Sequence, residues 1–441
     1  MISRPLAVTV GCLLAFVLFA RFAFFPTATS PDPPGVPAEP KPWTFVPAQH
    51  AKLHSLSPSQ CTASFPGLYD RILATAGQRT VENGLITYDE VRIASGRCML
   101  QVLVYEGEVG RRQISNCQKA NRSSQLYITD LGDPLECYVS NGRERIVATL
   151  SLIQRAIASS PHPVPNIEFP LSYDDLPTRS TPGVTWGYTR KETEDNVWLM
   201  PDYGYWSWWA IGIPSFNSMS RSISAVDAST PWREKLPRAV WRGTPHYAPA
   251  LREKLIETTR DKPWADVKTV TIGQDERHFL SLNDHCRYQY VLQTEGTSYS
   301  GRFKFLQLCN SVTVSHKLEY AEFATHLMDP SGPKQNFIQV QRDWSDLEEK
   351  MQYFERRPKE AEAIAARSRE LFADRYLTPA AVSCYLRQMI EAWAKVQGFE
   401  PQLCDINKTT GAKTIRGVPF EAFIVSFPQE KPGEYGRFAP G

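Results

Sequence analysis

Strand-like and helix-like segments alternate along most of the chain from about residue 95 to residue 396. Short apolar, β-branched runs predict strands, and apolar residues that recur every three to four positions predict helices. The strand-like runs lie at 99–105, 126–129, 138–139, 167–171, 239–242, 267–272, 290–294, 311–315 and 338–340, and helix-like stretches begin near 146, 249, 302, 345, 358 and 379. This alternation predicts an α/β fold in which helices cover parallel sheets.

The pattern divides the body into two α/β domains, which we expect to face a central cleft because open α/β sheets bind ligands at the carboxyl ends of their strands. The expected limits are 47–230 for an N-terminal domain, 231–378 for a C-terminal domain, and 379–441 for a helix and tail that pack back on the N-terminal domain. The aromatic segment 198–209 is compatible with sugar stacking, but its composition favours a core. Ser345 and Glu348 have the spacing of a capping box.

The N-terminus has a different pattern. After a tail of residues 1–4, residues 5–25 are apolar except for Arg21, which is long enough for a thin bilayer if Arg21 reaches the interface. We expect a transmembrane signal anchor; a cleaved signal peptide is the alternative. Arg4 favours a cytoplasmic N-terminus, with the body translocated. Residues 26–46 are rich in proline and predict an extended stalk.

Composition limits the class of protein. The chain has 441 residues, of which 49 are Lys or Arg and 47 are Asp or Glu, and 42% are hydrophobic. These values are typical of a folded globular protein. The net charge of +2 and the lack of a long basic run argue against nucleic acid as a partner, since phosphate contacts need a concentrated basic face.

Cysteines and sequons agree with a secretory location. Beyond Cys12 in the anchor, eight cysteines remain, an even number that predicts disulfides on the translocated side. No Cys/His cluster has zinc-ligand spacing, so a metal is not expected. Asn121 and Asn407 begin glycosylation sequons. Because the C-terminus has no KDEL-type signal, we expect a single-pass type II Golgi membrane protein with a lumenal body; the endoplasmic reticulum is the other possible location.

The segment 295–306 (EGTSYSGRFKFL) joins a predicted strand to a predicted helix. Gly296 and Gly301 allow the backbone to approach a ligand, and Arg302 adds a positive charge at a helix N-terminus. This combination predicts a diphosphate cradle, although it matches neither common phosphate-binding motif. An ordinary glycine-rich loop with a surface arginine would have the same pattern.

Two further arginines and two aspartates are candidate site residues. Arg242 ends a predicted strand and Arg252 lies in the next predicted helix; an arginine there can clamp phosphate, although Arg252 alone is also typical of a solvated helix residue. Asp174 and Asp175 follow another strand, where a carboxylate can act as a general base on an acceptor hydroxyl. Turn formation or capping would equally explain them.

Several of these motifs, in this order, resemble glycosyltransferase family 90. They are Trp-Arg-Gly at 241–243, DHCRYQY at 284–290, the 295–305 loop, Cys-x-Ser at 309–311 and VSCY at 382–385. The family includes protein O-glucosyltransferases and fungal capsule-associated xylosyltransferases. The resemblance covers roughly residues 160–396. The N-terminal anchor in place of a KDEL tail is more similar to the xylosyltransferase branch.

The resemblance implies a GT-B-like architecture of two Rossmann-like domains and an inverting reaction with a UDP-sugar. It implies that Arg302 and Arg242 hold the diphosphate, with Arg252 as a weaker third, and that Asp175 is the base, since Asp175-Leu-Pro fits the family register; Asp174 is the fallback. It also implies disulfides Cys286–Cys309 and Cys61–Cys384. The pairing of Cys98, Cys117, Cys137 and Cys404 stays open.

The function expected is transfer of xylose or glucose from a UDP-sugar to a hydroxyl of a glycan or glycoprotein. No obligate metal is expected, because arginines can supply the charge; restoration of activity by Mn²⁺ would overturn this. The alternatives are a non-catalytic lumenal sugar-binding protein and a glycoside hydrolase that pairs Asp174 or Asp175 with Glu295. The sequence does not choose the donor sugar, the acceptor or the oligomeric state.

Overall fold

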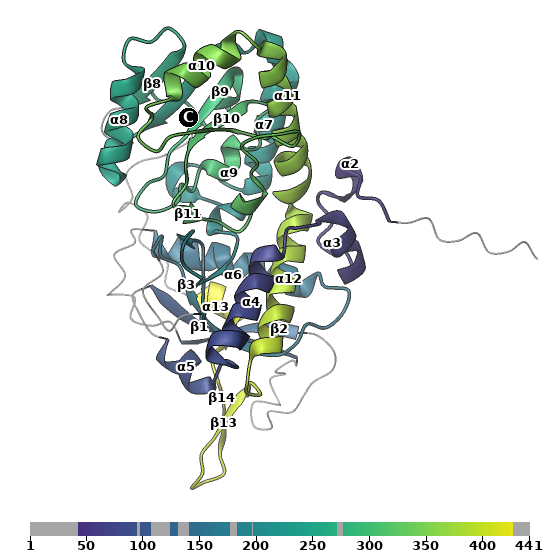
Figure 1. The fold of residues 1–441 in the computed structure, drawn as a ribbon. Helices are drawn as coiled ribbons and strands as arrows, with labels where there is room; N and C mark the ends of the chain where they lie inside the picture. The colour runs from purple at the N-terminus through teal and green to yellow at the C-terminus, as the bar shows by residue number, and fades with distance from the viewer. Residues whose placement is uncertain are drawn as a thin grey trace, which may run out of the picture. The chain divides into compact units, whose positions relative to one another are not determined.

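Two large β-sheets with helices packed on them make up most of the described fold, which also contains two small two-stranded sheets (Figure 1). The computed structural model describes residues 43–94, 98–106, 124–130, 141–176, 183–195, 197–270 and 277–426. The predicted tail and anchor, and the stalk up to residue 42, lie outside these residues. Within the described ranges no helix combines the length and apolar character needed to cross a membrane. Residues 44–441 form one unit, to which the following description refers.

The second half of this unit contains a five-stranded sheet in which every pair of strands is parallel. Its strands are β7 (Leu236–Gly243), β8 (Ala265–Thr269), β9 (Tyr288–Gln293), β10 (Val312–His316) and β12 (Ile338–Val340). Their spatial order is β8-β7-β9-β10-β12, a doubly wound order in which the chain moves outward in opposite directions from β7 and β9. The predicted parallel α/β arrangement is confirmed for this region.

Both faces of the five-stranded sheet are buried. On one face, Trp241 of β7 and its neighbours pack against α8 (Pro249–Thr259), α10 (Leu347–Glu355) and α11 (Pro358–Leu371) (Figure 1). On the other face, Val240 and Val291 pack against Leu306 of α9 (Phe303–Leu306). Successive residues of a strand therefore enter different layers, as the period of two requires.

The sheet of the first half has six strands and is mixed, which differs from the parallel Rossmann-like domain expected there. β1 (Met99–Glu106) runs antiparallel to β2 (Ser124–Asp130) and β3 (Ile167–Ser172), and β15 (Val418–Pro419) is antiparallel to β2. Only the pairs formed by β3, β4 (Thr185–Gly187) and β6 (Val197–Leu199) are parallel. The hydrophobic pattern predicts strands but contains no information about their direction.

Three helices pack in this half: α4 (Asp70–Asn83), α6 (Gly142–Ala158) and α12 (Pro379–Val396). The four residues of the predicted apolar stripe on α6 are buried, namely Ile146, Leu150, Ile153 and Ile157. Trp393 of α12 makes edge contacts with Trp186 and Trp198, at ring centroid distances of 6.1 and 5.2 Å. The helix predicted near 379 thus contributes to the core of the first half.

The remaining elements are short or lie at the edges. They are α2 (Pro47–His50), α3 (Pro58–Ser64), α5 (Tyr88–Ile93), α7 (Phe216–Ser229), α13 (Phe420–Ser426), β5 (Arg190–Lys191), β11 (Tyr320–Ala321), β13 (Cys404–Ile406) and β14 (Lys413–Ile415). The predicted capping box is wrong, because α10 begins at Leu347 after Asp346 and has no side-chain cap. Glu348 instead forms an ion pair of 2.8 Å with Lys262.

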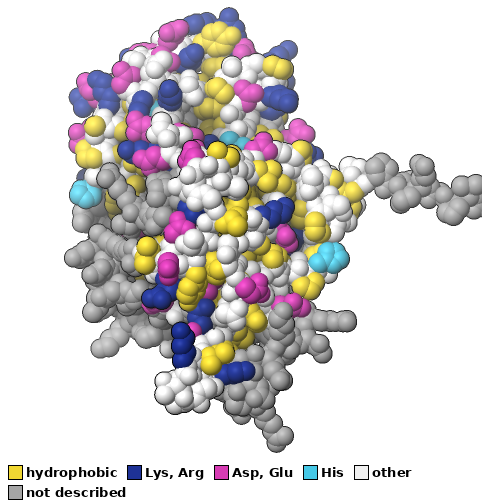
Figure 2. All heavy atoms as spheres, turned by 60° about the horizontal axis from the view of Figure 1, so that its bottom comes forward, with side chains coloured by type: hydrophobic (Ala, Val, Ile, Leu, Met, Phe, Trp, Pro, Cys, Tyr) yellow, Lys and Arg dark blue, Asp and Glu magenta, His cyan; other side chains and the backbone are white. Residues whose placement is uncertain are grey.

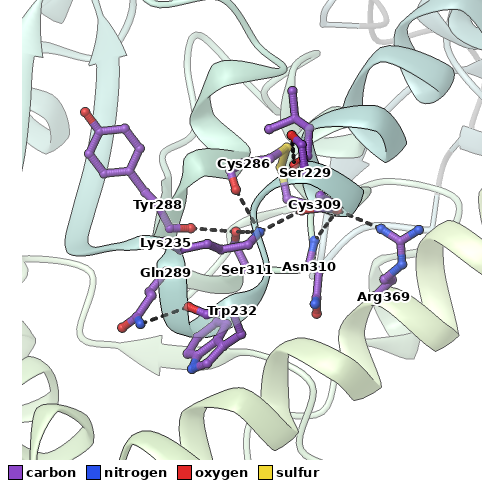
Figure 3. Close-up of polar contacts among 12 residues, drawn as sticks. Ser229, Trp232, Lys235, Cys286, Tyr288, Gln289, Cys309, Asn310, Ser311 and Arg369 are labelled. Carbon is purple, nitrogen blue, oxygen red and sulfur yellow. Dashed lines mark hydrogen bonds and ion pairs between the residues drawn. A yellow bond between two sulfur atoms is a disulfide. The ribbon is translucent and has the colours of Figure 1, made fainter.

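A buried polar network joins α7, the start of β7 and α11 (Figure 3). The ammonium of Lys235, whose side chain has no exposed area, donates to Asp227 Oδ1 at 2.6 Å and to the carbonyl of Cys286 at 2.7 Å. Arg369 binds the other oxygen of Asp227 at 2.6 Å. The disulfide Cys286–Cys309 lies beside this network. The polar network and the disulfide together stabilise the edge of the sheet at which the strands begin.

A second disulfide, Cys61–Cys384, connects α3 to α12 across 323 residues of sequence. Both pairs that the family resemblance implies are therefore present. Cys98 and Cys404 are also disulfide-bonded. Cys117 and Cys137 lie outside the described residues, as does the predicted strand at 138–139.

The aromatic segment is mostly core. Trp198, Tyr203 and Tyr205 are buried, whereas Trp209 is 54% exposed. On the face drawn in Figure 2, side chains of Lys and Arg alternate with those of Asp and Glu among the described residues. This face therefore has no large patch of one sign, in agreement with the small net charge of the chain.

Candidate active site

The strand order places the topological switch point of the sheet at the carboxyl ends of β7 and β9. β7 and β9 are neighbours, but their following connections lead to β8 on one side and β10 on the other. The two connections therefore diverge at this point, and doubly wound sheets bind their ligands at such a switch point. Arg252 of α8 comes from the connection after β7, and Arg302 ends the loop after β9. The topology thus brings together two arginines that lie 50 residues apart in the sequence.

Arg252 and Arg302 lie on the ring of Trp241, with guanidinium carbons 5.9 and 5.4 Å from its centroid. Arg252 is 6% exposed, and it donates to the carbonyls of Glu295 at 2.9 Å and Thr244 at 2.8 Å. Arg302 donates through Nη1 to the carbonyl of Arg242, while its Nη2 is shielded from solvent and has no partner. Neither guanidinium has a carboxylate partner among the described residues.

The electrostatics of this pair favour an anion. Burial, followed by the charge of Arg252, lowers the pKa of Arg302 to about 9, and burial lowers that of Arg252 to about 10. Both side chains are therefore charged at neutral pH but destabilised by desolvation and mutual repulsion. A diphosphate would supply the missing charge and accept the free Nη2 hydrogen bond.

Arg242 is bound differently from what the family resemblance implies for it. Its Nη2 forms an ion pair of 2.9 Å with Asp266, and its other nitrogens donate to the carbonyls of Trp241, Asp266 and His278. Tyr288 also donates to Asp266, at 2.5 Å. The charge of Arg242 is thus compensated within the protein, and its carbonyl orients Arg302.

The two glycines of the loop are required by close packing. A Cβ on Gly301 would lie 2.8 Å from the ring of Trp208, and a Cβ on Gly296 would lie 3.3 Å from Nη2 of Arg252. Neither glycine has a positive φ, so space rather than backbone conformation explains the residue type. The helix that follows, α9, has only four residues. It is too short for a substantial macrodipole, so the positive charge of the site comes from the arginines and not from the expected helix N-terminus.

Glu295 anchors the start of the loop. One carboxylate oxygen accepts from the backbone N–H groups of Glu319 and Tyr320 at 2.9 and 2.8 Å, and the other binds Arg342 at 2.6 Å. The side chain is 2% exposed. Because both oxygens are occupied by structural donors, Glu295 is unsuited to the hydrolase role considered for it.

Asp175 lies beyond the carboxyl end of β3 and next to the glycine-containing loop. Its carbonyl accepts from Ser298 Oγ at 2.6 Å, so the loop after β9 and the loop after β3 are in direct contact. The carboxylate of Asp175 is 40% exposed and forms an ion pair with Arg145. Asp174 Oδ1 accepts a hydrogen bond from the N–H of Asp175 at 2.7 Å. Such a local bond is typical of turn formation, the alternative to a catalytic role for these aspartates. The exposed Asp175 carboxylate is the better placed of the two to meet a substrate.

Two further side chains near the arginines were not assigned from the sequence. His285 has an unpartnered Nε2, and burial together with Arg302 lowers its pKa to about 4. Tyr299, in the loop itself, is 7% exposed with an unpartnered hydroxyl, and burial raises its pKa well above the ordinary value. In the sequence, His285 is noted only as part of the motif at 284–290. Its lowered pKa depends on tertiary packing, which the sequence does not reveal.

Metal ligands and sequons complete the predicted residues. Within the described ranges no three His, Cys, Asp or Glu side chains gather as a metal site. Asn407 is exposed in the turn between β13 and β14, where its Oδ1 accepts from the N–H groups of Thr409 and Thr410. Asn121 lies outside the described residues.

Two arginines without a carboxylate partner among the described residues thus lie at the switch point of a doubly wound sheet, an arrangement that suits an anionic ligand. A model of glycosyl transferase family 90 matches residues 116–417, more than half of the chain. The chain belongs to this family, which confirms the resemblance and establishes the glycosyltransferase class.

Known relatives are similar at low identity. Human protein O-glucosyltransferase 1 is 25% identical over 312 residues, which are 66% of this chain and 75% of the human protein. The O-glucosyltransferase rumi of Drosophila pseudoobscura pseudoobscura is 26% identical over 235 residues, 48% of this chain and 55% of the fly protein. The O-glucosyltransferase LpsA of Dichelobacter nodosus is 29% identical over 138 residues, 30% of this chain and 42% of that protein.

Proposed function

We propose that this protein is an inverting glycosyltransferase that moves xylose or glucose from a UDP-sugar to a hydroxyl of a glycan or glycoprotein. The names of the relatives, protein O-glucosyltransferase among them, support a glucose donor and a protein acceptor. Xylose stays the second candidate donor, because the family also includes xylosyltransferases. A GT-B-like arrangement, with the donor on the five-stranded sheet and the acceptor on the mixed sheet, belongs to this proposal.

The observation that carries the proposal is the pair of uncompensated arginines on Trp241. Cations that are partly or fully shielded from water and have no carboxylate partner destabilise a fold, so their presence at this edge of the sheet favours an anionic ligand. Arg302, with its free Nη2, and Arg252 are the principal diphosphate ligands of this proposal. Arg242 keeps the supporting position that its ion pair with Asp266 indicates. This reverses the ranking of Arg242 and Arg252 drawn from the sequence.

The mechanism is a single displacement. Asp175 accepts the proton of the acceptor hydroxyl, the oxygen attacks the anomeric carbon from the face opposite to UDP, and the bond to the diphosphate breaks with inversion. Arg302 and Arg252 stabilise the negative charge that develops on the leaving diphosphate. The arginines supply charge that a divalent metal supplies in other transferases, so activity is expected to survive EDTA. Loss with EDTA and recovery with Mn²⁺ would contradict this part.

The location follows from the N-terminal sequence. We infer a single-pass type II protein of the Golgi membrane, with residues 5–25 as anchor and the body in the lumen. The sequons at Asn121 and Asn407 and the disulfides Cys61–Cys384 and Cys286–Cys309 agree with such a location. Loss of one glycan mass in an Asn407→Gln variant from a secretory host would support it.

Release of UDP by the purified full-length chain tests the function. UDP-xylose, UDP-glucose and other UDP-sugars are supplied with and without mannoside or peptide acceptors, and UDP binding is measured by calorimetry. The expected result is turnover of one donor by the wild type, a residual rate about 10²–10⁴-fold lower in Asp175→Asn, and UDP affinity unchanged in that variant. Arg302→Ala should lose at least 100-fold in turnover, by analogy with loss of an oxyanion donor.

Two outcomes would contradict the proposal. UDP binding of equal affinity in wild type and Arg302→Ala would remove the diphosphate site. Binding of glycans without turnover of any donor would favour the non-catalytic sugar-binding protein. Asp175→Asn separates the two functions, because it strongly lowers the rate of transfer but leaves the binding of a lectin-like protein intact.

A further inference from the structure

Arg145, in the first turn of α6, binds the carboxylate of Asp175 through two hydrogen bonds. Its Nη1 donates to Asp175 Oδ1 at 2.8 Å and its Nη2 to Oδ2 at 3.3 Å. The two residues come from different elements of the first half, 30 positions apart in the sequence. This two-point contact matches the planar fork of the guanidinium to the planar carboxylate.

The guanidinium itself is held on its remaining sides. Nε donates to Asn141 Oδ1 at 3.0 Å, and Nη1 also donates to the carbonyl of Tyr173 at 3.3 Å. The guanidinium carbon lies 4.7 Å from the ring centroid of Tyr203. Only 9% of the Arg145 side chain is exposed. The position of the fork is thus set by α6, the end of β3 and a buried aromatic ring.

The charge of Arg145 is retained in this site. Burial opposes it, but Tyr203, Asp175 and Tyr299 together raise its pKa above the ordinary value. A permanent cation at this place is a lasting partner for the carboxylate that it contacts through two nitrogens.

The two sides of the Asp175 carboxylate differ. Arg145 occupies one side, whereas 40% of the aspartate side chain is exposed. Each carboxylate oxygen has two acceptor positions, so the contact with Arg145 leaves acceptor capacity free for a hydroxyl. Asp175 lies on a loop, whose side chains otherwise exchange rotamers freely, so a fixed partner has a large effect on its orientation.

We propose that Arg145 is a positioning residue that orients Asp175 toward the acceptor hydroxyl. This inference rests on the proposed function, in which Asp175 is the base. It assigns no contact between Arg145 and the substrate. Arg145 therefore acts on the chemical step and not on donor binding, which distinguishes it from Arg302 and Arg252.

Steady-state kinetics of the full-length chain test this role with Arg145→Ala, Arg145→Lys, Asp175→Asn and the double variant Arg145→Ala/Asp175→Asn. A displaced base should lower kcat about 100-fold in Arg145→Ala while the Kd for UDP stays within twofold of wild type. Arg145→Lys, which keeps the charge but lacks the fork, should recover part of kcat. Millimolar guanidinium should partly rescue Arg145→Ala and no other variant.

Arg155→Ala is the matched control. Arg155 lies on the same helix, and its guanidinium carbon is 3.9 Å from the ring centroid of Trp206, but it does not contact Asp175. Its removal takes away a similar aromatic contact and should leave kcat within threefold of wild type. A thermal melt of each variant shows that the fold is retained.

The double variant gives the decisive comparison. If Arg145 acts through Asp175, Arg145→Ala has no further effect once Asp175 is Asn. Multiplicative losses, or a kcat within threefold of wild type in Arg145→Ala, would overturn the positioning role while leaving the proposed function standing. Full activity of Asp175→Asn would instead remove the base and the proposed function with it.

Discussion

Replacing Arg302 by methionine should stabilise the ligand-free protein while abolishing the response to UDP. Methionine fills a similar volume without a charge. The lowering of the pKa of Arg302 from 12.5 to about 9 corresponds to about 5 kcal/mol against the charged side chain. Because the residue is only half-buried and also loses its bond to the Arg242 carbonyl, we expect a net gain of about 1–3 kcal/mol in the free energy of unfolding.

The sign with respect to pH follows from the direction of the shift. Below pH 9 the guanidinium of Arg302 is charged in both the folded and the unfolded chain. The charge therefore destabilises the folded state by its full amount in this range. Between pH 9 and 12.5 the unfolded chain binds more protons, so the stability of the wild type rises toward that of Arg302→Met. At neutral pH the difference between wild type and variant is therefore at its largest.

Differential scanning fluorimetry with and without UDP measures both effects. A unit of this size has an unfolding entropy near 0.8 kcal/mol/K, so the gain corresponds to a Tm rise of about 1–4 °C. Saturating UDP at 100 times Kd should add about 2.7 kcal/mol to the wild type and nothing to Arg302→Met.

Arg242→Met is the matched contrast. Arg242 has the same side chain as Arg302 and lies at the same edge of the sheet. Its replacement, however, would leave Asp266 without its ion pair. The variant should be destabilised by about 3–5 kcal/mol, the cost of breaking a buried pair. A lower Tm for Arg302→Met than for the wild type without UDP, or a stabilised Arg242→Met, would refute the reasoning about uncompensated charge.

Three other substitutions test separate parts of the structure. Gly301→Ala places a methyl group 2.8 Å from the ring of Trp208, and the overpacking costs about 1–3 kcal/mol. The loop should be displaced, so calorimetry should show weaker binding of UDP. An affinity equal to that of the wild type would contradict the packing argument. Asp227→Asn leaves the buried ammonium of Lys235 without a carboxylate and should lower the free energy of unfolding in urea by about 3–5 kcal/mol, so a loss below 1 kcal/mol would be inconsistent with the network. Desolvation raises the pKa of Glu322 from 4.5 to about 8, so the wild type loses stability as pH rises through this range. The stability of Glu322→Gln relative to the wild type should therefore increase from pH 5 to pH 8. A difference in Tm that does not depend on pH would contradict this prediction.

The sequence predicted the elements of the five-stranded sheet well, because buried strands and amphipathic helices have distinct periods. The runs at 239–242, 290–294 and 338–340 all lie in or next to the observed strands β7, β9 and β12. The direction of β1 and β2 could not be predicted, since an antiparallel pair has the same alternation as a parallel one. The disulfides came from the family resemblance and not from spacing.

The candidate site was predicted only in part. The family resemblance ranked Arg242 above Arg252, and only the tertiary structure shows that Asp266 compensates the first and no described carboxylate compensates the second. Arg145 was missed because it precedes the apolar stripe of α6 that was used to predict the helix. It continues a second stripe through Thr149, which is also buried. An arginine inside a buried helical stripe is the pattern that would have indicated it.

The bond between Cys61 and Cys384 also sets an order of events during synthesis. At about 5–20 residues per second, the ribosome needs roughly 16–65 s to make the 323 residues between the two cysteines. Throughout that time Cys61 lacks its native partner, while other cysteines of the chain emerge earlier. We therefore expect the yield of the protein in a heterologous host to follow the capacity of that host for disulfide isomerisation.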